Sequence, residues 1–357
     1  MQKWTKIAIT VVAVVAVASA GTYEVLTSAS PSNPCAGTTV PAPSLTSPLP
    51  EITPGFDPNV TSAPSGLSPG STGSAHVAPG SLIQVVAGEN FWGSLVSQLG
   101  GNRTSVISIV DDPNTDPHEY EANTTDAEEI SSAQFVIVNG VGYDDWALQL
   151  IAAADSSNQI VLNVGDLNGV NVNGGIVTGN PHQWYNPYYV IRTVAAMYMD
   201  LVSIQPSSTS YFQANYAALN ASLDRLYAQA NWIRNDRSGT VVASTESIFV
   251  YLANYTNLDL ASPPTFMEAI AEGNDPTTQN IVTFQCQLES GKVGILVYNE
   301  QTVSPITSNM KSIAAQHNVT VIGVTETIQP PDVSFQNWMG GEYDYLANAL
   351  NATVLGE

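Results

Sequence analysis

Two of the four histidines in this 357-residue chain follow a proline, and they are the residues best suited to chemistry. His118 ends the Asp-Pro-His tripeptide at 116–118, and His182 lies in Asn-Pro-His-Gln-Trp at 180–184. Proline fixes one of its own backbone angles and disfavours a helical conformation in the residue before it, so each imidazole is expected on a short, stiff loop. Imidazoles on two separate loops predict a site for a divalent metal ion.

Two glutamates follow predicted strands in the second half of the chain. Glu246 comes after a strand predicted at 240–243, and Glu326 comes after one predicted at 319–324. In α/β proteins, ligands bind at the carboxyl ends of parallel strands. Two neutral imidazoles with two carboxylates form a donor set for zinc, manganese or ferrous iron, whereas calcium prefers oxygen alone and copper(I) prefers sulfur.

An imidazole that binds a metal normally has its other ring nitrogen fixed by a hydrogen bond. Asp116, Glu121 and Asn186 lie close enough in sequence to be such partners, and the sequence does not choose among them. The two remaining histidines are interpreted as lying outside the site. His76 lies in a polar linker and His317 precedes a strand.

Each of these residues also has an ordinary structural interpretation. A histidine next to proline is commonly a loop residue, and a glutamate at a strand end is commonly a solvated charge or a helix cap. An extracytoplasmic metallohydrolase would need an open metal position and a general base, but the chain has no HExxH motif and the candidate ligands spread over roughly 200 residues. A surface adhesin on a long tether and a siderophore or cobalamin receptor remain alternatives.

The charge balance restricts the partners. Nine basic residues against 31 acidic ones give a formal net charge of −22, which argues against nucleic acid and anionic membrane surfaces as partners. A cation or another protein fits this surface better, and we expect a monomer. Of the two cysteines, Cys35 lies in the linker and Cys286 in a predicted helix, so we expect neither a structural disulfide nor a thiolate metal site.

The first residues predict an extracytoplasmic location: secreted, periplasmic or on the outer face of the cytoplasmic membrane. Lys3 and Lys6 precede an apolar run that ends in Ala-Ser-Ala at 18–20, so 1–27 is interpreted as a signal peptide or an uncleaved membrane anchor. The context of Cys35 does not predict lipid attachment. Residues 28–81 are dominated by Pro, Ser, Thr and Gly and are interpreted as a linker.

From residue 82 onwards, β-branched runs alternate with helical segments, which predicts an α/β fold with mostly parallel sheets. We expect a first lobe at 82–206, a second lobe at 237–357, and a single amphipathic helix about 40 Å long at 207–236 between them. Thr-Asp-Ala-Glu at 125–128 is expected to form a capping box. Strands are predicted at 83–87, 105–110, 135–138, 159–164, 240–243, 293–298 and 319–324, and helices at 90–99, 125–132, 247–253, 276–290, 303–316 and 334–350.

Several motifs, in order along the chain, resemble those of the extracytoplasmic solute-binding proteins of zinc and manganese ABC importers. The resemblance covers essentially all of 82–350. The motifs are Gly-Glu-Asn-Phe-Trp-Gly at 88–93, Asp-Pro-His-Glu-Tyr-Glu at 116–121, Asn-Gly-Val-Gly-Tyr-Asp at 139–144, Asn-Pro-His-Gln-Trp-Tyr-Asn-Pro at 180–187, Thr-Glu-Ser-Ile-Phe-Val-Tyr at 245–251, Tyr-Asn-Glu-Gln at 298–301, Val-Thr-Glu-Thr at 324–327 and Phe-Gln-Asn-Trp-Met at 335–339.

This resemblance implies two α/β lobes on a backbone helix, with a divalent ion buried between the lobes. The implied ligands are His118 and His182 from the first lobe and Glu246 and Glu326 from the second. Glu246 stands where many zinc receptors have histidine and manganese receptors have glutamate, and Glu326 stands where many members have aspartate. The implied function is capture of zinc, manganese or ferrous iron outside the membrane and delivery to an ABC permease, without catalysis. Asn186 replaces an aspartate common in the second histidine motif.

Overall fold

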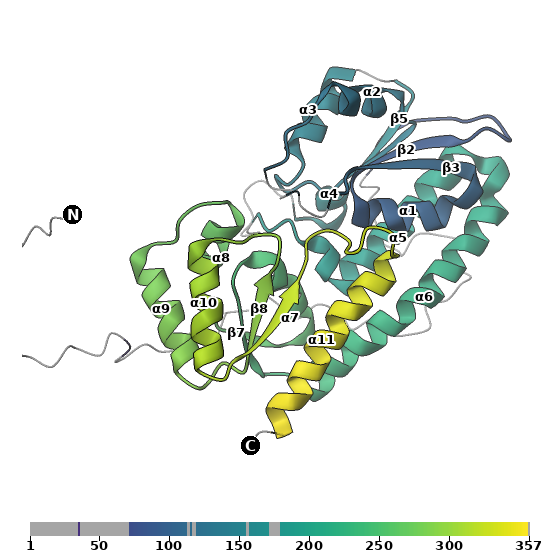
Figure 1. Ribbon diagram of the computed structural model, residues 1–357. Helices are drawn as coiled ribbons and strands as arrows, with labels where there is room; N and C mark the ends of the chain where they lie inside the picture. Colours follow the sequence, from purple (N-terminus) through teal and green to yellow (C-terminus); the bar gives the residue numbers. More distant parts are fainter. Residues whose placement is uncertain are drawn as a thin grey trace, which may run out of the picture.

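The computed structural model describes residues 35, 71–112, 115, 119–154, 157–170 and 179–355. The predicted leader at 1–27 and most of the predicted linker lie outside these residues. Within them, the chain forms two α/β lobes joined by one long helix, which confirms the predicted fold (Figure 1). In this part of the chain, no helix combines the length and apolar character needed to cross a bilayer.

A five-stranded sheet forms the centre of the first lobe, with its strands in the order β1-β5-β4-β2-β3. Four strands run parallel, and β1 pairs antiparallel with β5 at one edge. β1 lies inside the range predicted to be linker. The sequence did not predict this strand because a short polar strand pairs through its backbone and leaves no apolar pattern. The strands are β1 (Ser71–Ser74), β2 (Ile83–Glu89), β3 (Thr104–Val110), β4 (Phe135–Val138) and β5 (Gln159–Asn163).

Helices cover both faces of this sheet. Alternate side chains of β2 and β4 pack on one face against α1 and α5, and on the other face against α2 and α3. The capping box of α2 is formed by Asn123 and Asp126, two residues before the predicted box, since asparagine at the N-cap accepts from the free backbone N–H groups. The helices are α1 (Asn90–Gly100), α2 (Thr124–Ser132), α3 (Asp145–Ala154), α4 (Val164–Asn168) and α5 (Pro187–Ile204).

The second lobe has a four-stranded parallel sheet in the order β7-β6-β8-β9. Its outer face packs against α8, α9 and α10 around Phe266, Phe284 and Met310. Its strands are β6 (Val241–Ser244), β7 (Asp259–Leu260), β8 (Ile295–Asn299) and β9 (Thr320–Val324). Its helices are α7 (Val250–Thr256), α8 (Pro264–Ala271), α9 (Thr278–Glu289), α10 (Pro305–Gln316) and α11 (Phe335–Leu355).

The connecting helix α6 (Thr209–Asp236) has 28 residues, which corresponds to a length of about 42 Å. It contacts α1 and α5 of the first lobe and α7 of the second, and α11 runs alongside it (Figure 1). One hydrophobic core continues from the first lobe through α6 and α11 into the inner face of the second sheet. Because a close-packed core transmits rather than absorbs displacement, the two lobes are held at a defined separation.

A disulfide joins Cys35 to Cys286, with a Cα–Cα distance of 5.1 Å. The expectation that no structural disulfide forms is therefore wrong. The two cysteines are 251 residues apart in sequence, and a polar linker gives no sign of where its chain returns to the body. The bond attaches the N-terminal segment to α9 of the second lobe, and disulfides of this kind persist in oxidising compartments outside the cytoplasm.

Candidate metal centre

The imidazole of His182 is fully buried and held by the residues around it. The Asn180 side chain donates from Nδ2 to the Ser247 carbonyl (2.8 Å), so its Oδ1 is the atom that faces the ring. That Oδ1 accepts from the His182 backbone N–H (3.0 Å) and lies 2.8 Å from Nδ1, while Ser247 Oγ lies 3.4 Å from the same nitrogen. An acceptor at this distance places the proton on Nδ1 and turns the lone pair of Nε2 toward the second lobe.

Glu246 follows β6 and begins a short 3₁₀ turn at Ser247–Phe249. Its Oε1 accepts from the backbone N–H of Ile248 (2.9 Å), and the Ser244 hydroxyl donates to its carbonyl (2.7 Å). The residue is completely buried. The strand end and the cap thus fix a carboxylate in the protein interior, where a charge needs a compensating partner.

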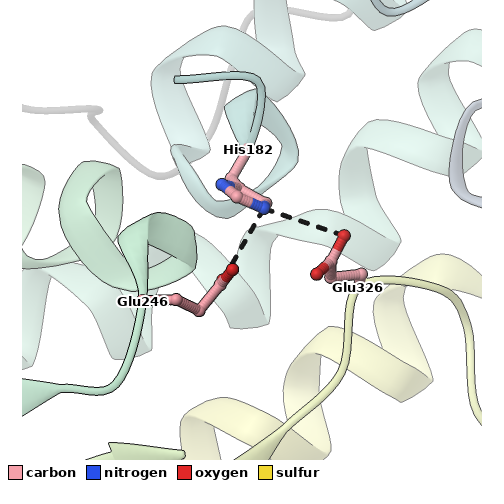
Figure 2. Close-up of side chains that lie close together, drawn as sticks. All are labelled: His182, Glu246 and Glu326. Carbon is pink, nitrogen blue, oxygen red and sulfur yellow. Dashed lines mark ion pairs between the residues drawn. The ribbon is translucent and has the colours of Figure 1, made fainter. Parts of the chain in front are cut away.

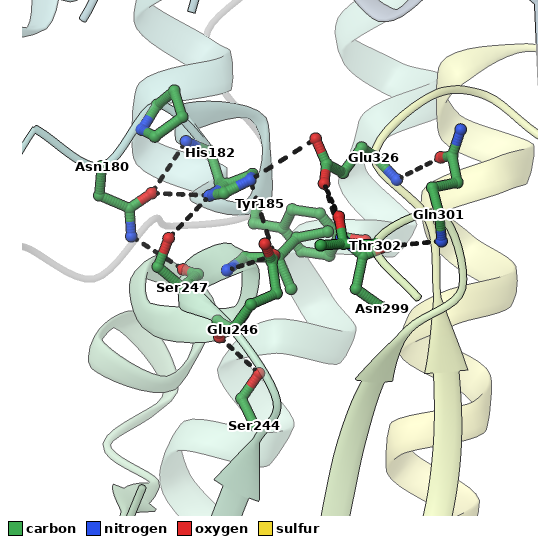
Figure 3. Close-up of polar contacts among 12 residues, drawn as sticks. Asn180, His182, Tyr185, Ser244, Glu246, Ser247, Asn299, Gln301, Thr302 and Glu326 are labelled. Atoms are coloured by element: carbon green, nitrogen blue, oxygen red, sulfur yellow. Dashed lines mark hydrogen bonds and ion pairs between the residues drawn. The ribbon is translucent and has the colours of Figure 1, made fainter. Parts of the chain in front are cut away.

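Glu326 follows β9 and is also completely buried. Oε1 accepts from Asn299 Nδ2 (2.6 Å) and from the Thr302 hydroxyl (3.1 Å), whereas Oε2 accepts from the Tyr143 hydroxyl of the first lobe (2.8 Å). Gln301 Oε1 accepts from the backbone N–H of Glu326 (2.7 Å) and holds this loop in place (Figure 3). Both oxygens of Glu326 are therefore oriented before any ion binds.

These three side chains converge between the lobes (Figure 2). Nε2 of His182 lies 3.7 Å from Oε1 of Glu246 and 3.8 Å from Oε2 of Glu326. One ligand atom from each of the three residues lies within 4.8 Å of the other two. Two donors that share a tetrahedral zinc ion about 2.1 Å away would be separated by about 3.4 Å, close to this spacing. A divalent ion would also offset the two buried carboxylate charges, so the donor set fits such an ion in distance and in charge.

A cavity of about 550 Å³ adjoins this site between the lobes. Tyr143, Asn180 and Pro181 line it from the first lobe, and Ser247 and Met267 line it from the second. Because Asn180 and Ser247 also contact His182, the cavity leads directly to the residues that orient the imidazole.

The loop ahead of His182 rests on a buried acid pair. The Asn139 side chain donates to the Pro181 carbonyl (2.9 Å), and its backbone N–H donates to Asp144 (2.6 Å). Burial raises the pKa of Asp144, and burial together with Asp144 raises the pKa of Glu89 well above its usual range. Glu89 therefore keeps its proton and hydrogen bonds to Asp144, which lets the two carboxyls remain buried next to each other.

The structure brings together His182, Glu246 and Glu326 of the four predicted ligands. His118 and Asp116 lie outside the described residues. Of the other predicted partners, Glu121 is exposed, and the side chain of Asn186 accepts from the Tyr188 N–H (3.0 Å) and caps α5. The observed partner of the His182 ring is Asn180, two residues earlier.

The sequence predicted no role for the residues that orient the three side chains. They are Tyr143, Asn180, Ser247, Asn299, Gln301 and Thr302. All except Thr302 lie within the motifs that carry the family resemblance. Their presence in those motifs was the available signal, but only the folded structure shows which side chain each one contacts.

Comparison with known proteins gives consistent matches. Residues 85–349 match the family described as zinc-uptake complex component A, periplasmic. The chain is 23% identical over 304 residues to the manganese ABC transporter substrate-binding lipoprotein PsaA of Streptococcus pneumoniae, covering 80% of this chain and 94% of that protein. It is 27% identical over 174 residues to the manganese-binding lipoprotein MntA of Halalkalibacterium halodurans, a match that spans 48% of this chain and 55% of MntA.

Solved structures share the fold. The periplasmic zinc-binding protein TroA of Treponema pallidum superimposes with a TM-score of 0.64 at 16% sequence identity, over 75% of this chain and 99% of TroA. At this level of identity the likeness concerns the fold alone: two α/β lobes joined by a long helix.

Proposed function

The chain belongs to the zinc-uptake complex component A family of periplasmic solute-binding proteins, and we propose that it captures a divalent metal ion at His182, Glu246 and Glu326. Members of this family are non-enzymatic components of ABC import systems that bind zinc or manganese outside the cytoplasm. The observation that carries the proposal is the convergence of one oriented imidazole and two buried carboxylates at the boundary between the lobes. His118 is proposed as a fourth ligand from its sequence motif.

We propose manganese as the physiological cargo. Carboxylate oxygens suit manganese, and two of the three assembled donors are carboxylates. PsaA and MntA, which the chain resembles, are named for manganese. Zinc should still bind the same donors more tightly in vitro, because divalent affinity rises from manganese to zinc for most nitrogen and oxygen sites.

The proposed partner is the permease of an ABC importer, and the proposed location is the outer side of the cytoplasmic membrane. Residues 1–27 would direct export and either be removed or stay as an anchor. The Cys35 sulfur is bonded to Cys286, so it is not available for the lipid attachment found in lipoproteins.

Metal analysis of the purified chain tests this function. The protein is purified without chelator, and bound metals are quantified by mass spectrometry for the native chain and for His182→Ala and Glu246→Gln. We expect about one equivalent of manganese or zinc in the native chain, and a large loss in both variants. His317→Ala and Glu128→Gln, which change exposed residues, are the matched controls and should retain metal. A native chain that takes up neither metal on titration would refute the proposal.

A further inference from the structure

Glu342 is a buried carboxyl on α11 that the donor set does not use. Its Oε1 accepts from the backbone N–H of Thr325 (2.9 Å), the residue directly before Glu326, and also faces the Thr325 hydroxyl (3.2 Å). Its Oε2 is hydrogen bonded to the hydroxyl of Tyr185. Tyr185 lies three residues after His182, so this one carboxyl contacts the segments that carry a candidate ligand from each lobe.

We propose that Glu342 and Tyr185 are positioning residues that fix the separation of His182 and Glu326, with Glu342 acting as a neutral carboxylic acid. The proposal rests on the metal-binding function proposed above. None of the predicted ligands or their expected partners lies on α11, so the proposal gives this helix a new role at the metal site.

The donors and acceptors around the Tyr185 hydroxyl support the neutral form of Glu342. The Tyr185 hydroxyl has one proton, and it lies 2.8 Å from the carbonyl oxygen of Thr325, which can only accept. If that proton goes to the carbonyl, the proton in the Tyr185–Glu342 bond must come from Glu342. A protonated Oε2 donates to Tyr185 while Oε1 accepts from the Thr325 N–H, so a single acid satisfies both contacts.

The surroundings favour the same protonation state. Burial raises the pKa of Glu342 to about 7, against smaller opposing effects of its hydrogen bonds to Tyr185, Thr325 and Trp338. The titratable groups that face it are Tyr185 and Tyr343, and Glu326 acts in turn on Tyr185. All of these carry either no charge or negative charge, so they disfavour a second anion at this position.

The hydrogen bonds among Tyr185, Glu342 and Thr325 form a bridge between the two segments that carry His182 and Glu326. Gln301 holds the Glu326 loop from within the second lobe, whereas the Tyr185 and Glu342 contacts tie that loop to the turn that follows His182. Tyr185 is completely buried, and its ring packs edge-to-face against Trp338 at the start of α11 (ring centroids 6.4 Å apart). Because these contacts hold the Tyr185 hydroxyl in place, a displacement of Thr325 would also displace the turn that follows His182.

Four variants test the proposal by titration with manganese and with zinc: Tyr185→Phe, Glu342→Gln, Glu342→Leu and the double variant Tyr185→Phe/Glu342→Leu. Loss of a residue that orients a metal ligand typically weakens metal binding by roughly 10–100-fold, and we expect this for Tyr185→Phe and Glu342→Leu. Glu342→Gln should stay within about threefold of the native chain, because its amide donates to Tyr185 and its oxygen accepts from Thr325 as the neutral acid does. The double variant should bind no more weakly than the weaker single variant, since both remove one shared bridge.

Asp344→Asn is the matched control, since Asp344 lies on the same helix, is partly exposed and pairs with Arg225. Tyr185→Phe keeps the test decisive if the leucine variant does not fold. The proposal is overturned if Tyr185→Phe and Glu342→Leu bind both metals like the native chain, or if Glu342→Gln binds as weakly as Glu342→Leu. In either case the native chain would still bind metal through His182, Glu246 and Glu326, whereas failure of the native chain itself would count against the proposed function.

Discussion

In the second lobe, two carboxylates follow parallel strands and are fixed by backbone N–H groups and amide side chains, whereas the first lobe brings uncharged groups to the same site. Glu246 and Glu326 carry the negative charge, and His182 and Tyr143 contribute an imidazole lone pair and a hydroxyl. The attraction for a cation therefore comes mainly from the second lobe. The first lobe supplies an imidazole that binds a metal only after losing its proton, so it makes binding depend on pH.

The largest effect should follow from removing charge in the second lobe. Glu326→Gln keeps the shape of the side chain but removes one of two buried carboxylate charges, and losing a partner in a buried charged cluster costs about 3–5 kcal/mol. We expect manganese affinity to fall by more than about a hundredfold in an isothermal titration. Glu300→Gln, which changes an exposed glutamate of the same lobe, is the control. Equal affinities for native and Glu326→Gln protein would place the charge that attracts the ion elsewhere.

Removing the disulfide should lower the stability of the second lobe without changing the geometry of its metal site. Cys286→Ser removes a cross-link between residues 251 apart, and native disulfides typically stabilise a fold by about 2–4 kcal/mol. We expect a lower melting temperature, with metal affinity within about twofold, because Cys286 lies on α9 rather than among the donors. Cys35→Ser should give the same shift. Intact mass after alkylation without reductant should show no labelled thiol, and a labelled native chain would contradict the bond.

The first lobe offers a paired test of two asparagines close to His182. Asn180→Ala removes the acceptor that holds the Nδ1 proton and should weaken metal binding by roughly 10–100-fold. Asn186→Ala removes the cap of α5 and should cost about 1 kcal/mol of stability with little change in metal affinity. Titration and thermal unfolding of both variants separate these effects. If Asn186→Ala weakens metal binding as much as Asn180→Ala, cap and ligand orientation are not separable in this loop.

The same contrast explains what the sequence could reveal. The continuous apolar run Phe135–Val138 and the 28-residue helix α6, with its apolar residues at intervals of three and four, were predictable because both patterns follow from burial. Glu246 and Glu326 were predictable as candidate ligands because only a few residues directly follow the predicted strands of an α/β chain. Contacts between segments far apart in sequence were not predictable in this way. The pairing of β1 with β5, the Cys35–Cys286 bond and the Tyr143–Glu326 hydrogen bond each depend on where the chain returns in space.

The choice of Asn180 over Asn186 shows the same limit at short range. Both residues lie within four positions of His182, and each has a side-chain oxygen able to accept from an imidazole. What separates them is the backbone path: the helix that starts at Pro187 engages Asn186 as its cap, which leaves Asn180 to face the ring. Spacing gives candidates, and local conformation selects among them.

A further expected effect concerns pH and separates folding from metal binding. Burial raises the pKa of Asp200 on α5 to about 6, from a usual value of 3.8, although it accepts a hydrogen bond from Ser71 (2.6 Å). The folded state therefore binds more protons than the unfolded state between these values, so stability falls as pH rises from about 4 to 6 and stays low above that range. Glu342 adds the same slope up to about pH 7. Metal binding through an imidazole has the opposite slope.

Asp200→Asn resembles the protonated acid and isolates this contribution far from the donors. We expect it to raise the stability of the metal-free protein by roughly 1–2 kcal/mol at pH 7.5 and to have almost no effect at pH 4, where the native aspartate is itself protonated in the fold. Thermal unfolding at both pH values measures the difference, and a metal titration at pH 7.5 should give the native affinity. An equal gain at both pH values would mean that Asp200 acts through packing and not through its proton. A gain only at the higher pH would mean that a partly buried acid of the first lobe favours folding in acid, while the imidazole of the same lobe favours metal binding at neutral pH.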